Sequence, residues 1–155
     1  MIQRIQTIYL LAVAGMFIAL LFVPLADIQT NEAQYSFGVD GLKTTTVAAE
    51  LVFPTWSLLA IAAIIVLLSF FIIFMYKKRV LQMRMCVYNI LLMIGFCALL
   101  GFYIWQFKKS PNLQDMKINI RFWATFPFVA LILNYLAIRN IGADEAMIRS
   151  LERLR

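Results

Sequence analysis

Four long apolar runs without a charged residue constrain the fold of this chain more than any other feature. An α-helix needs about 20 consecutive apolar residues to cross the hydrocarbon core of a bilayer, and each run comes close to that length. A helix also satisfies its own backbone hydrogen bonds, which lipid requires. The sequence therefore predicts an all-α membrane protein with four transmembrane helices, over residues 5–25, 56–76, 86–107 and 122–138.

The composition agrees with lipid as the main surroundings of the chain. Hydrophobic residues make up 63% and charged residues 14%, whereas soluble domains have about 45–50% and about 25%. The net charge of +6 does not indicate nucleic-acid binding, because the Lys and Arg residues lie between apolar runs and are not clustered with aromatics on a soluble scaffold. We expect lipid as a partner and no nucleic acid.

The Lys and Arg residues between the runs predict the orientation, because positively charged loops tend to stay in the cytoplasm. With both termini cytoplasmic, the inner side holds Arg4, Lys77, Lys78, Arg79, Arg84, Arg139, Arg149, Arg153 and Arg155. The outer side then holds only Lys43, Lys108, Lys109, Lys117 and Arg121. All three tryptophans, Trp56, Trp105 and Trp123, fall at run ends on the outer side, as expected of residues that favour the membrane interface.

Residues 26–53 form the only sizeable polar segment, and we expect this small loop in the periplasm. The stretch QYSFGVDGLKTTTV has alternating apolar residues around a Gly-Val-Asp-Gly turn, which predicts a short β-hairpin. Because an isolated hairpin is marginal in water, it should lean on the helix ends or on a partner. The sequence leaves open whether the loop binds anything or only caps the helices.

Residues 141–155 predict a short C-terminal amphipathic helix in the cytoplasm that begins after Gly142. Its apolar stripe consists of Met147, Leu151 and Leu154. Acidic residues at its start and arginines at its end suit the helix dipole. The nearly balanced charge favours contact with protein over contact with lipid alone.

The residue types that most enzymes use are missing. The chain has no histidine, and its two cysteines do not form a Cys-x-x-Cys motif. No Asp, Glu, Lys or Arg lies inside an apolar run, although ion-driven transporters generally place one there. We therefore expect no catalytic residue, no cofactor, no metal and no active transport.

Small and amide residues in the runs are candidates for helix packing, because small residues let helices approach closely and amides hydrogen-bond between helices. These residues are Ala12, Gly15, Ala19, Asn89, Cys97, Gly101 and Asn134. They would either pack one bundle internally or dock a partner subunit. In addition, Pro127 is expected to kink the fourth helix.

The two ends of the chain, MIQRIQTIYLL and IGADEAMIRSLERLR, resemble a family of small four-helix membrane proteins from Bacteroidota that is classed as a domain of unknown function. The resemblance implies a Gram-negative inner membrane and a periplasmic first loop, and it implies no activity. The residues that match these end motifs are Gln3, Arg4, Gln6, Asp144, Glu145, Arg149, Ser150, Arg153 and Arg155. We hypothesise that they form one cytoplasmic surface, either as a contact between the two termini or as a docking site.

Three functions fit these observations to different degrees. The first is a non-enzymatic accessory or structural subunit of a bacterial inner-membrane assembly, with another membrane protein as partner. The second is a small passive pore or carrier, which would require Asn89, Gln106 and Asn134 to line one path. The third is a membrane enzyme acting on lipid or envelope precursors, which would require a cleft at the outer surface that joins Arg121 to an acid.

Overall fold

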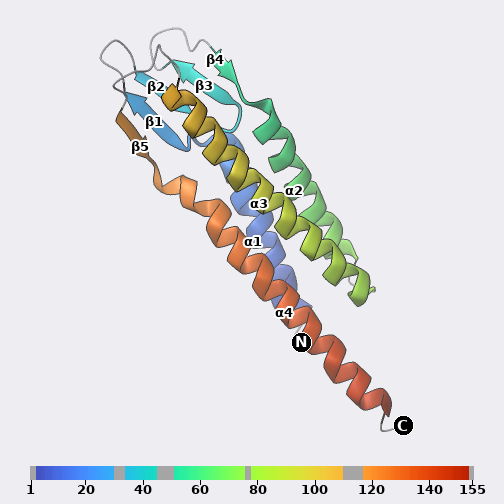
Figure 1. Ribbon diagram of the computed structural model, residues 1–155. Helices are drawn as coiled ribbons and strands as arrows, with labels where there is room; N and C mark the ends of the chain where they lie inside the picture. Colours follow the sequence, from blue (N-terminus) through green and yellow to red (C-terminus); the bar gives the residue numbers. More distant parts are fainter. Residues whose placement is uncertain (1–2, 30–33, 45–50, 76–77, 110–116, 154–155) are drawn as a thin grey trace.

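The computed structural model is a four-helix bundle with a small antiparallel sheet at one end, and it describes residues 3–29, 34–44, 51–75, 78–109 and 117–153 (Figure 1). The helices are α1 Gln3–Phe22, α2 Trp56–Phe74, α3 Arg79–Lys109 and α4 Phe126–Arg153, with the 3₁₀ helix η2 Phe122–Thr125 directly before α4. α1 packs on α2 and α4, and α3 packs on the same two helices. The start of α1 and the end of α4 are both at the end of the bundle opposite the sheet, which we call the terminal end (Figure 1).

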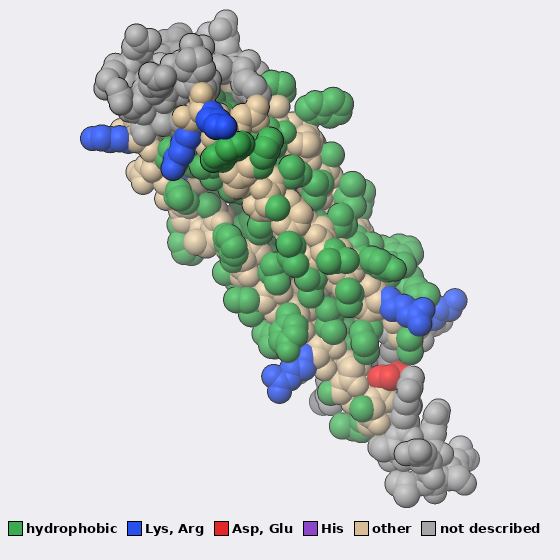
Figure 2. Space-filling view, in the orientation of Figure 1, with side chains coloured by type: hydrophobic (Ala, Val, Ile, Leu, Met, Phe, Trp, Pro, Cys, Tyr) green, Lys and Arg blue, Asp and Glu red, His purple; other side chains and the backbone are tan. Residues whose placement is uncertain are grey.

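All four helices are long and apolar enough to cross a membrane. Many large apolar side chains stay exposed on them, among them Ile8, Leu67, Leu91 and Ile132. Figure 2 shows such side chains over the middle of the bundle, whereas Lys and Arg gather towards its two ends. Exposed apolar surface of this extent marks contact with lipid or another protein. The four predicted spans are thus found as four helices, and they indicate a multi-pass membrane protein.

At the terminal end, two helices extend beyond the predicted spans. α3 begins at Arg79 rather than at Cys86, and α4 continues as a single helix through Gly142. The predicted C-terminal helix over residues 141–155 is found as far as Arg153, but its predicted start after Gly142 is wrong, because the segment is the last part of α4.

Packing explains why α4 does not stop at its glycine. Ile141 is fully buried in a cluster with Leu10 of α1 and Cys86 of α3. A Cβ placed on Gly142 would lie 3.6 Å from Cε of Met83, so the early part of α3 covers this stretch of α4. Such tertiary contacts outweigh the low helix propensity of one glycine, which costs about 1 kcal/mol.

The sheet has five antiparallel strands in the order β4-β3-β2-β1-β5. They are β1 Ala26–Gln29, β2 Gln34–Phe37, β3 Gly41–Thr44, β4 Leu51–Pro54 and β5 Lys117–Ile120. β2 and β3 are the predicted hairpin, whose turn is closed by a hydrogen bond from Gly38 N to Gly41 O at 2.9 Å. The sequence analysis did not predict the other three strands, and β5 comes from a different loop.

The alternation of side chains gives this sheet one apolar and one polar face. Ala26, Phe37 and Leu42 are partners across β1, β2 and β3, and all three are buried. The next row on the same strands, on the opposite face, is Asp27, Ser36 and Lys43. The polar face therefore carries Asp27 and Lys43.

The apolar face rests on the ends of the helices. The ring of Phe37 packs edge-on against Phe107 of α3, with ring centroids 5.3 Å apart. Thr55, directly before α2, donates from Oγ1 to the carbonyl oxygen of Val39 at 3.2 Å. The hairpin thus leans on the helix ends and on its neighbouring strands, which overcomes the marginal stability of a lone hairpin.

Two further features of the bundle concern aromatic and proline residues. Phe17 of α1 and Phe96 of α3 meet edge-to-face in the core, with ring centroids 5.4 Å apart, so they join the two helices that lie diagonally opposite.

Pro127 falls in the first turn of α4, where its missing N–H leaves no intrahelical bond unmade. The predicted kink inside the fourth helix is therefore wrong, and Pro127 marks the start of α4.

Candidate functional site

The two end motifs of the chain meet at the terminal end of the bundle. Gln6 of α1 donates a hydrogen bond from Nε2 to Oδ2 of Asp144 in α4, at 2.6 Å across 138 residues of sequence. Both side chains are buried, with 6% and 8% of their surface exposed. A buried hydrogen bond of this kind fixes its partners, because leaving either group unpaired costs free energy.

This contact assigns different roles to the residues of the predicted surface. Gln6 and Asp144 are buried against each other, so they connect the termini and do not face a partner. Glu145 is half-buried beside them. The remaining residues of this surface lie in the first turn of α1 or near the end of the chain, and their side chains fall outside the described part: Gln3, Arg4, Arg149, Ser150, Arg153 and Arg155.

Three polar side chains are enclosed between helices in the half of the bundle nearer the termini. Ser69 of α2 donates to the carbonyl oxygen of Ile65 at 2.8 Å and accepts from Asn89 Nδ2 of α3 at 3.0 Å. Asn134 of α4 donates from Nδ2 to the carbonyl oxygen of Cys86 at 3.4 Å. The two amides therefore link α2, α3 and α4. Such bonds in membranes contribute about 0.6–2 kcal/mol each.

The two asparagines lie close together. The Asn134 amide contacts the Cys86 carbonyl and, at 4.0 Å, Met93 Sδ, which are one turn of α3 to either side of Asn89. The side-chain oxygens of both asparagines are buried and accept no hydrogen bond within the described part of the chain. A buried acceptor without a donor costs free energy in an apolar interior, and this cost offsets part of what the donated bond of each amide contributes.

The small residues predicted to bring helices together lie elsewhere. Gly15 and Gly101 are exposed, and a Cβ on either would meet no atom within 4 Å. Ala12, Ala19 and Cys97 are only partly buried. Within one chain, the close helix contacts instead use fully or almost fully buried alanines that the sequence analysis did not select, namely Ala14, Ala62, Ala130 and Ala137.

At the sheet end, Arg121 connects β5 and α4 to β1. Its Nε donates to Oδ2 of Asp27 at 2.6 Å, and its backbone N donates to the carbonyl oxygen of Leu25 at 3.0 Å. The hydrogen bond to Asp27, together with the charge of that carboxyl, raises the pKa of Arg121 above its ordinary value. Arg121 therefore joins the two strands through a backbone hydrogen bond and a partly exposed ion pair.

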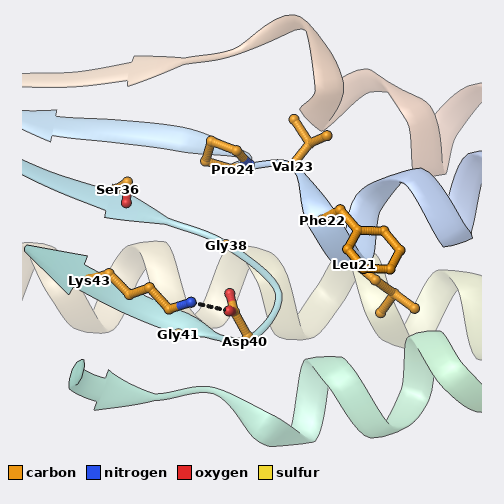
Figure 3. Close-up of a pocket in the computed structure, with 9 residues that line it drawn as sticks. All are labelled: Leu21, Phe22, Val23, Pro24, Ser36, Gly38, Asp40, Gly41 and Lys43. Atoms are coloured by element: carbon orange, nitrogen blue, oxygen red, sulfur yellow. Dashed lines mark hydrogen bonds and ion pairs between the residues drawn. The ribbon is translucent and has the colours of Figure 1, made fainter. Parts of the chain in front are cut away.

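A cavity of about 150 Å³ lies where the last turn of α1 meets the polar face of the sheet (Figure 3). One wall is apolar and comes from the end of α1 and the segment after it, residues 21–24. The other wall is polar and contains Ser36, Asp40 and Lys43. Figure 3 shows the Lys43 side chain extended towards Asp40, and the two form an ion pair of 2.5 Å.

The described residues offer little chemistry for catalysis. No three His, Cys, Asp or Glu side chains among them come together as metal ligands. The ion pair of Arg121 with Asp27 is the acid–base neighbourhood that the enzyme hypothesis required, but neither residue lines the cavity. The polar contacts among the described residues hold helices and strands together, and no nucleophile among these residues lies beside a base.

Residues 2–154 match the model of a protein family described as a domain of unknown function, DUF4293. The chain belongs to the DUF4293 family. The match takes in all four helices and all five strands, so the bundle and the sheet together are the unit that DUF4293 defines. The expected membership in a family of unknown function is confirmed, and the description of DUF4293 gives no activity. No curated protein matches the chain.

The cavity of this DUF4293 protein and the burial of Ser69 and Gln82 were not predicted from the sequence. Gln82 donates from Nε2 to the carbonyl oxygen of Ile72 at 3.3 Å and so connects α3 to the end of α2. Its position between basic residues gave no sign of burial. The cavity could have been suspected from the Gly-Val-Asp-Gly turn, because this turn contains an acid, Asp40, and is followed closely by a base, Lys43.

Proposed function

We propose that this DUF4293 protein is a non-enzymatic accessory or structural subunit of a bacterial inner-membrane assembly, and that α4 binds another membrane protein of that assembly. The observation that carries the proposal is the length of α4. It continues from Asp144, its hydrogen-bonded contact with α1, to Arg153. At roughly 1.5 Å per residue this is about 13 Å of helix. Figure 1 shows it running past the ends of the other three helices.

The chemistry of this projecting segment suits a protein partner. Its sequence combines the apolar spacing of Met147, Leu151 and Leu154 with charges of both signs. Helical segments with an apolar stripe flanked by mixed charges commonly dock into grooves of other proteins. A surface anchor for anionic lipid would be strongly basic instead. The excess of Lys and Arg at the terminal end supports placing this segment in the cytoplasm.

The buried contact between Gln6 and Asp144 supports a structural role for the protein. It holds the beginning of the projecting segment on α1, so the helix leaves the bundle at a defined angle. A rigid projecting helix binds with a smaller entropy loss than a flexible tail would.

The packing of the interior gives less support to the two alternatives. A pore would need Asn89, Asn134 and Gln106 along one polar path, but Phe17, Met93 and Phe96 are fully buried in the core between the asparagines and the sheet end. An enzyme would need an acid beside Arg121 within a cleft. Arg121 and Asp27 instead make an exposed pair that joins two strands.

Site-specific cross-linking tests the proposal in membranes of the native host. A photoreactive amino acid replaces Ser150 in the projecting segment, and in a matched control it replaces Lys117 at the sheet end. We expect one discrete membrane-protein adduct from position 150 and none of the same mass from position 117. The double variant Arg149→Glu/Arg153→Glu should remove this adduct, whereas Lys117→Glu should not.

Two results would contradict the proposal. One is the absence of any discrete adduct from position 150 at normal expression, and the other is an adduct that survives the double charge reversal unchanged. The orientation is tested separately, with single cysteines at positions 150 and 117 in a cysteine-free chain. A membrane-impermeant maleimide applied to spheroplasts should label position 117 and not position 150.

A further inference from the structure

The cavity at the sheet end has two unlike walls, which is unusual for a simple packing defect. Leu21, Val23 and Pro24 supply apolar surface from the end of α1. Asp40 and Lys43 face them with a carboxyl and an ammonium group in direct contact. A cavity that offers a hydrocarbon wall, an anion and a cation at once is suited to an amphiphilic ligand that carries both charges.

The cavity also lies at the end of the apolar stretch of α1, a position expected to be near the lipid head groups. α1 reaches the end of its membrane-spanning stretch at Phe22, which is 83% exposed, and Phe22 itself lines the cavity. Trp56, the first residue of α2, is 75% exposed at the same end of the bundle. Exposed aromatic residues at helix ends are typical of the membrane–water interface.

The ion pair retains the capacity to bind a ligand. The Lys43 ammonium has three N–H donors and the Asp40 carboxyl several acceptor positions, so their mutual bond leaves most of them available. Both side chains remain partly open, at 38% and 40% exposure. The C-terminal end of α1, which has no basic residue in its last turn, adds a negative field that favours a cation.

The turn holds the carboxyl in place over the backbone. A Cβ on Gly38 would lie 2.7 Å from Oδ1 of Asp40, so only a glycine lets the Asp40 side chain fold back into the cavity. Gly41 closes the same turn with a positive φ of 149°. Engineered cavities of about 150 Å³ in other proteins admit a benzene-sized ligand, which sets the scale for a small polar head group.

We propose that this cavity binds the head group of a phospholipid with a primary ammonium and a phosphodiester, that is, a phosphatidylethanolamine. The ammonium donates to Asp40, and the phosphate accepts from Lys43 and from the Ser36 hydroxyl. The glycerol and acyl chains continue along the apolar wall beside Phe22. This binding does not depend on the projecting end of α4, so it stands or falls separately from the accessory role.

The test offers the purified full-length protein equal amounts of phosphatidylethanolamine, phosphatidylcholine and phosphatidylglycerol with identical acyl chains, and counts the retained lipids by native mass spectrometry. Phosphatidylethanolamine should be preferred over phosphatidylcholine about fivefold, since a trimethylammonium has no N–H to donate and one ordinary hydrogen bond has this effect. Phosphatidylglycerol, which lacks the cation, should be retained no better than phosphatidylcholine.

Variants separate the cavity from lipid that merely surrounds the bundle. Asp40→Asn should remove the preference, and Ser36→Leu, which fills the cavity without changing a charge, should do the same. Lys43→Gln should lower the retention of phosphatidylethanolamine and phosphatidylcholine alike, because both carry the phosphate. Lys117→Gln, an exposed base at the same end but outside the cavity, should keep the preference. Circular dichroism checks that each variant is folded, as expected because partly exposed ion pairs stabilise little.

Three outcomes would overturn the lipid assignment. The first is retention of the three lipids in the proportions supplied. The second is an equal loss of preference in Lys117→Gln. The third is displacement of the bound lipid by soluble glycerophosphoethanolamine at equal concentration, which would mean that the acyl chains contribute nothing and that the ligand is a free head group.

Discussion

The hydrogen bond between Gln6 and Asp144 can be measured with a double-mutant cycle. Asp144→Leu removes the acceptor and leaves Gln6 Nε2 buried without its partner, which costs about 1–3 kcal/mol. Gln6→Leu leaves the Asp144 carboxyl without its donor and should cost a similar amount. The double variant replaces both groups by apolar ones, and such an exchange can be nearly neutral. We therefore expect the double variant to be more stable than either single variant.

The assay is unfolding of the purified protein in mixed micelles, followed by circular dichroism. For a chain of this length, about 1 kcal/mol corresponds to about 2–4 °C in Tm, so each single variant should melt roughly 4–8 °C lower for a loss of about 2 kcal/mol. As a control, Gln29→Leu at the sheet end is combined with Asp144→Leu. These distant positions should be additive within about 0.5 kcal/mol. If the Gln6 and Asp144 variants are also additive, the contact does not hold the termini together.

Three further predictions use the same unfolding assay. Asn89→Leu should change the free energy of unfolding by less than about 1 kcal/mol. The substitution removes the favourable bond to Ser69, but it also removes a buried amide oxygen that has no donor, and the two effects oppose each other. A loss of several kcal/mol would mean that the amide oxygen has a partner. Gly15→Ala should raise the free energy of unfolding by about 0.5–1 kcal/mol, because Gly15 lies inside a helix with open space around it. Gly41→Ala should lower it by about 1 kcal/mol or more, because Gly41 has a positive φ. Changes of equal sign in the two variants would contradict this reasoning. Arg121→Gln should barely change Tm, because the ion pair is exposed and the backbone bond to Leu25 remains; a large drop would mean that the side chain holds the sheet.

The sequence predicted the bundle well because lipid imposes a strict requirement. A run such as Trp56–Phe74 has a single stable solution in a bilayer, so length and the absence of charge suffice to find it. The hairpin could be predicted for a local reason, because the glycines at positions 38 and 41 mark its turn. Helix ends outside the membrane are less constrained. Gly142 was misread as a boundary because its packing partner, Met83, lies on another helix.

The rest of the sheet and the polar contacts depend on information that is not local. β1 and β5 have only four residues each, and although Lys-Ile-Asn-Ile alternates, nothing in that segment says that it pairs with a strand from the other loop. Likewise, the sequence motifs suggested that Gln6 and Asp144 share a surface, but whether they face each other or a partner depends on how α1 and α4 pack. The cavity is the extreme case, because it exists only where two separate segments meet, the end of α1 and the β2–β3 hairpin.

The pairing of β5 with β1 has a consequence for how the protein is made. Asp27 and Arg121, which join these strands, are 94 residues apart, and two further helices lie between them. During synthesis, the outer edge of β1 stays without its neighbour until the third helix has crossed and the segment after it has emerged on the sheet side. An unpaired edge invites association with other chains. The sheet is thus completed only after three of the four helices have been made, and a protein cut short before β5 would keep the edge of β1 open to proteases and to other chains.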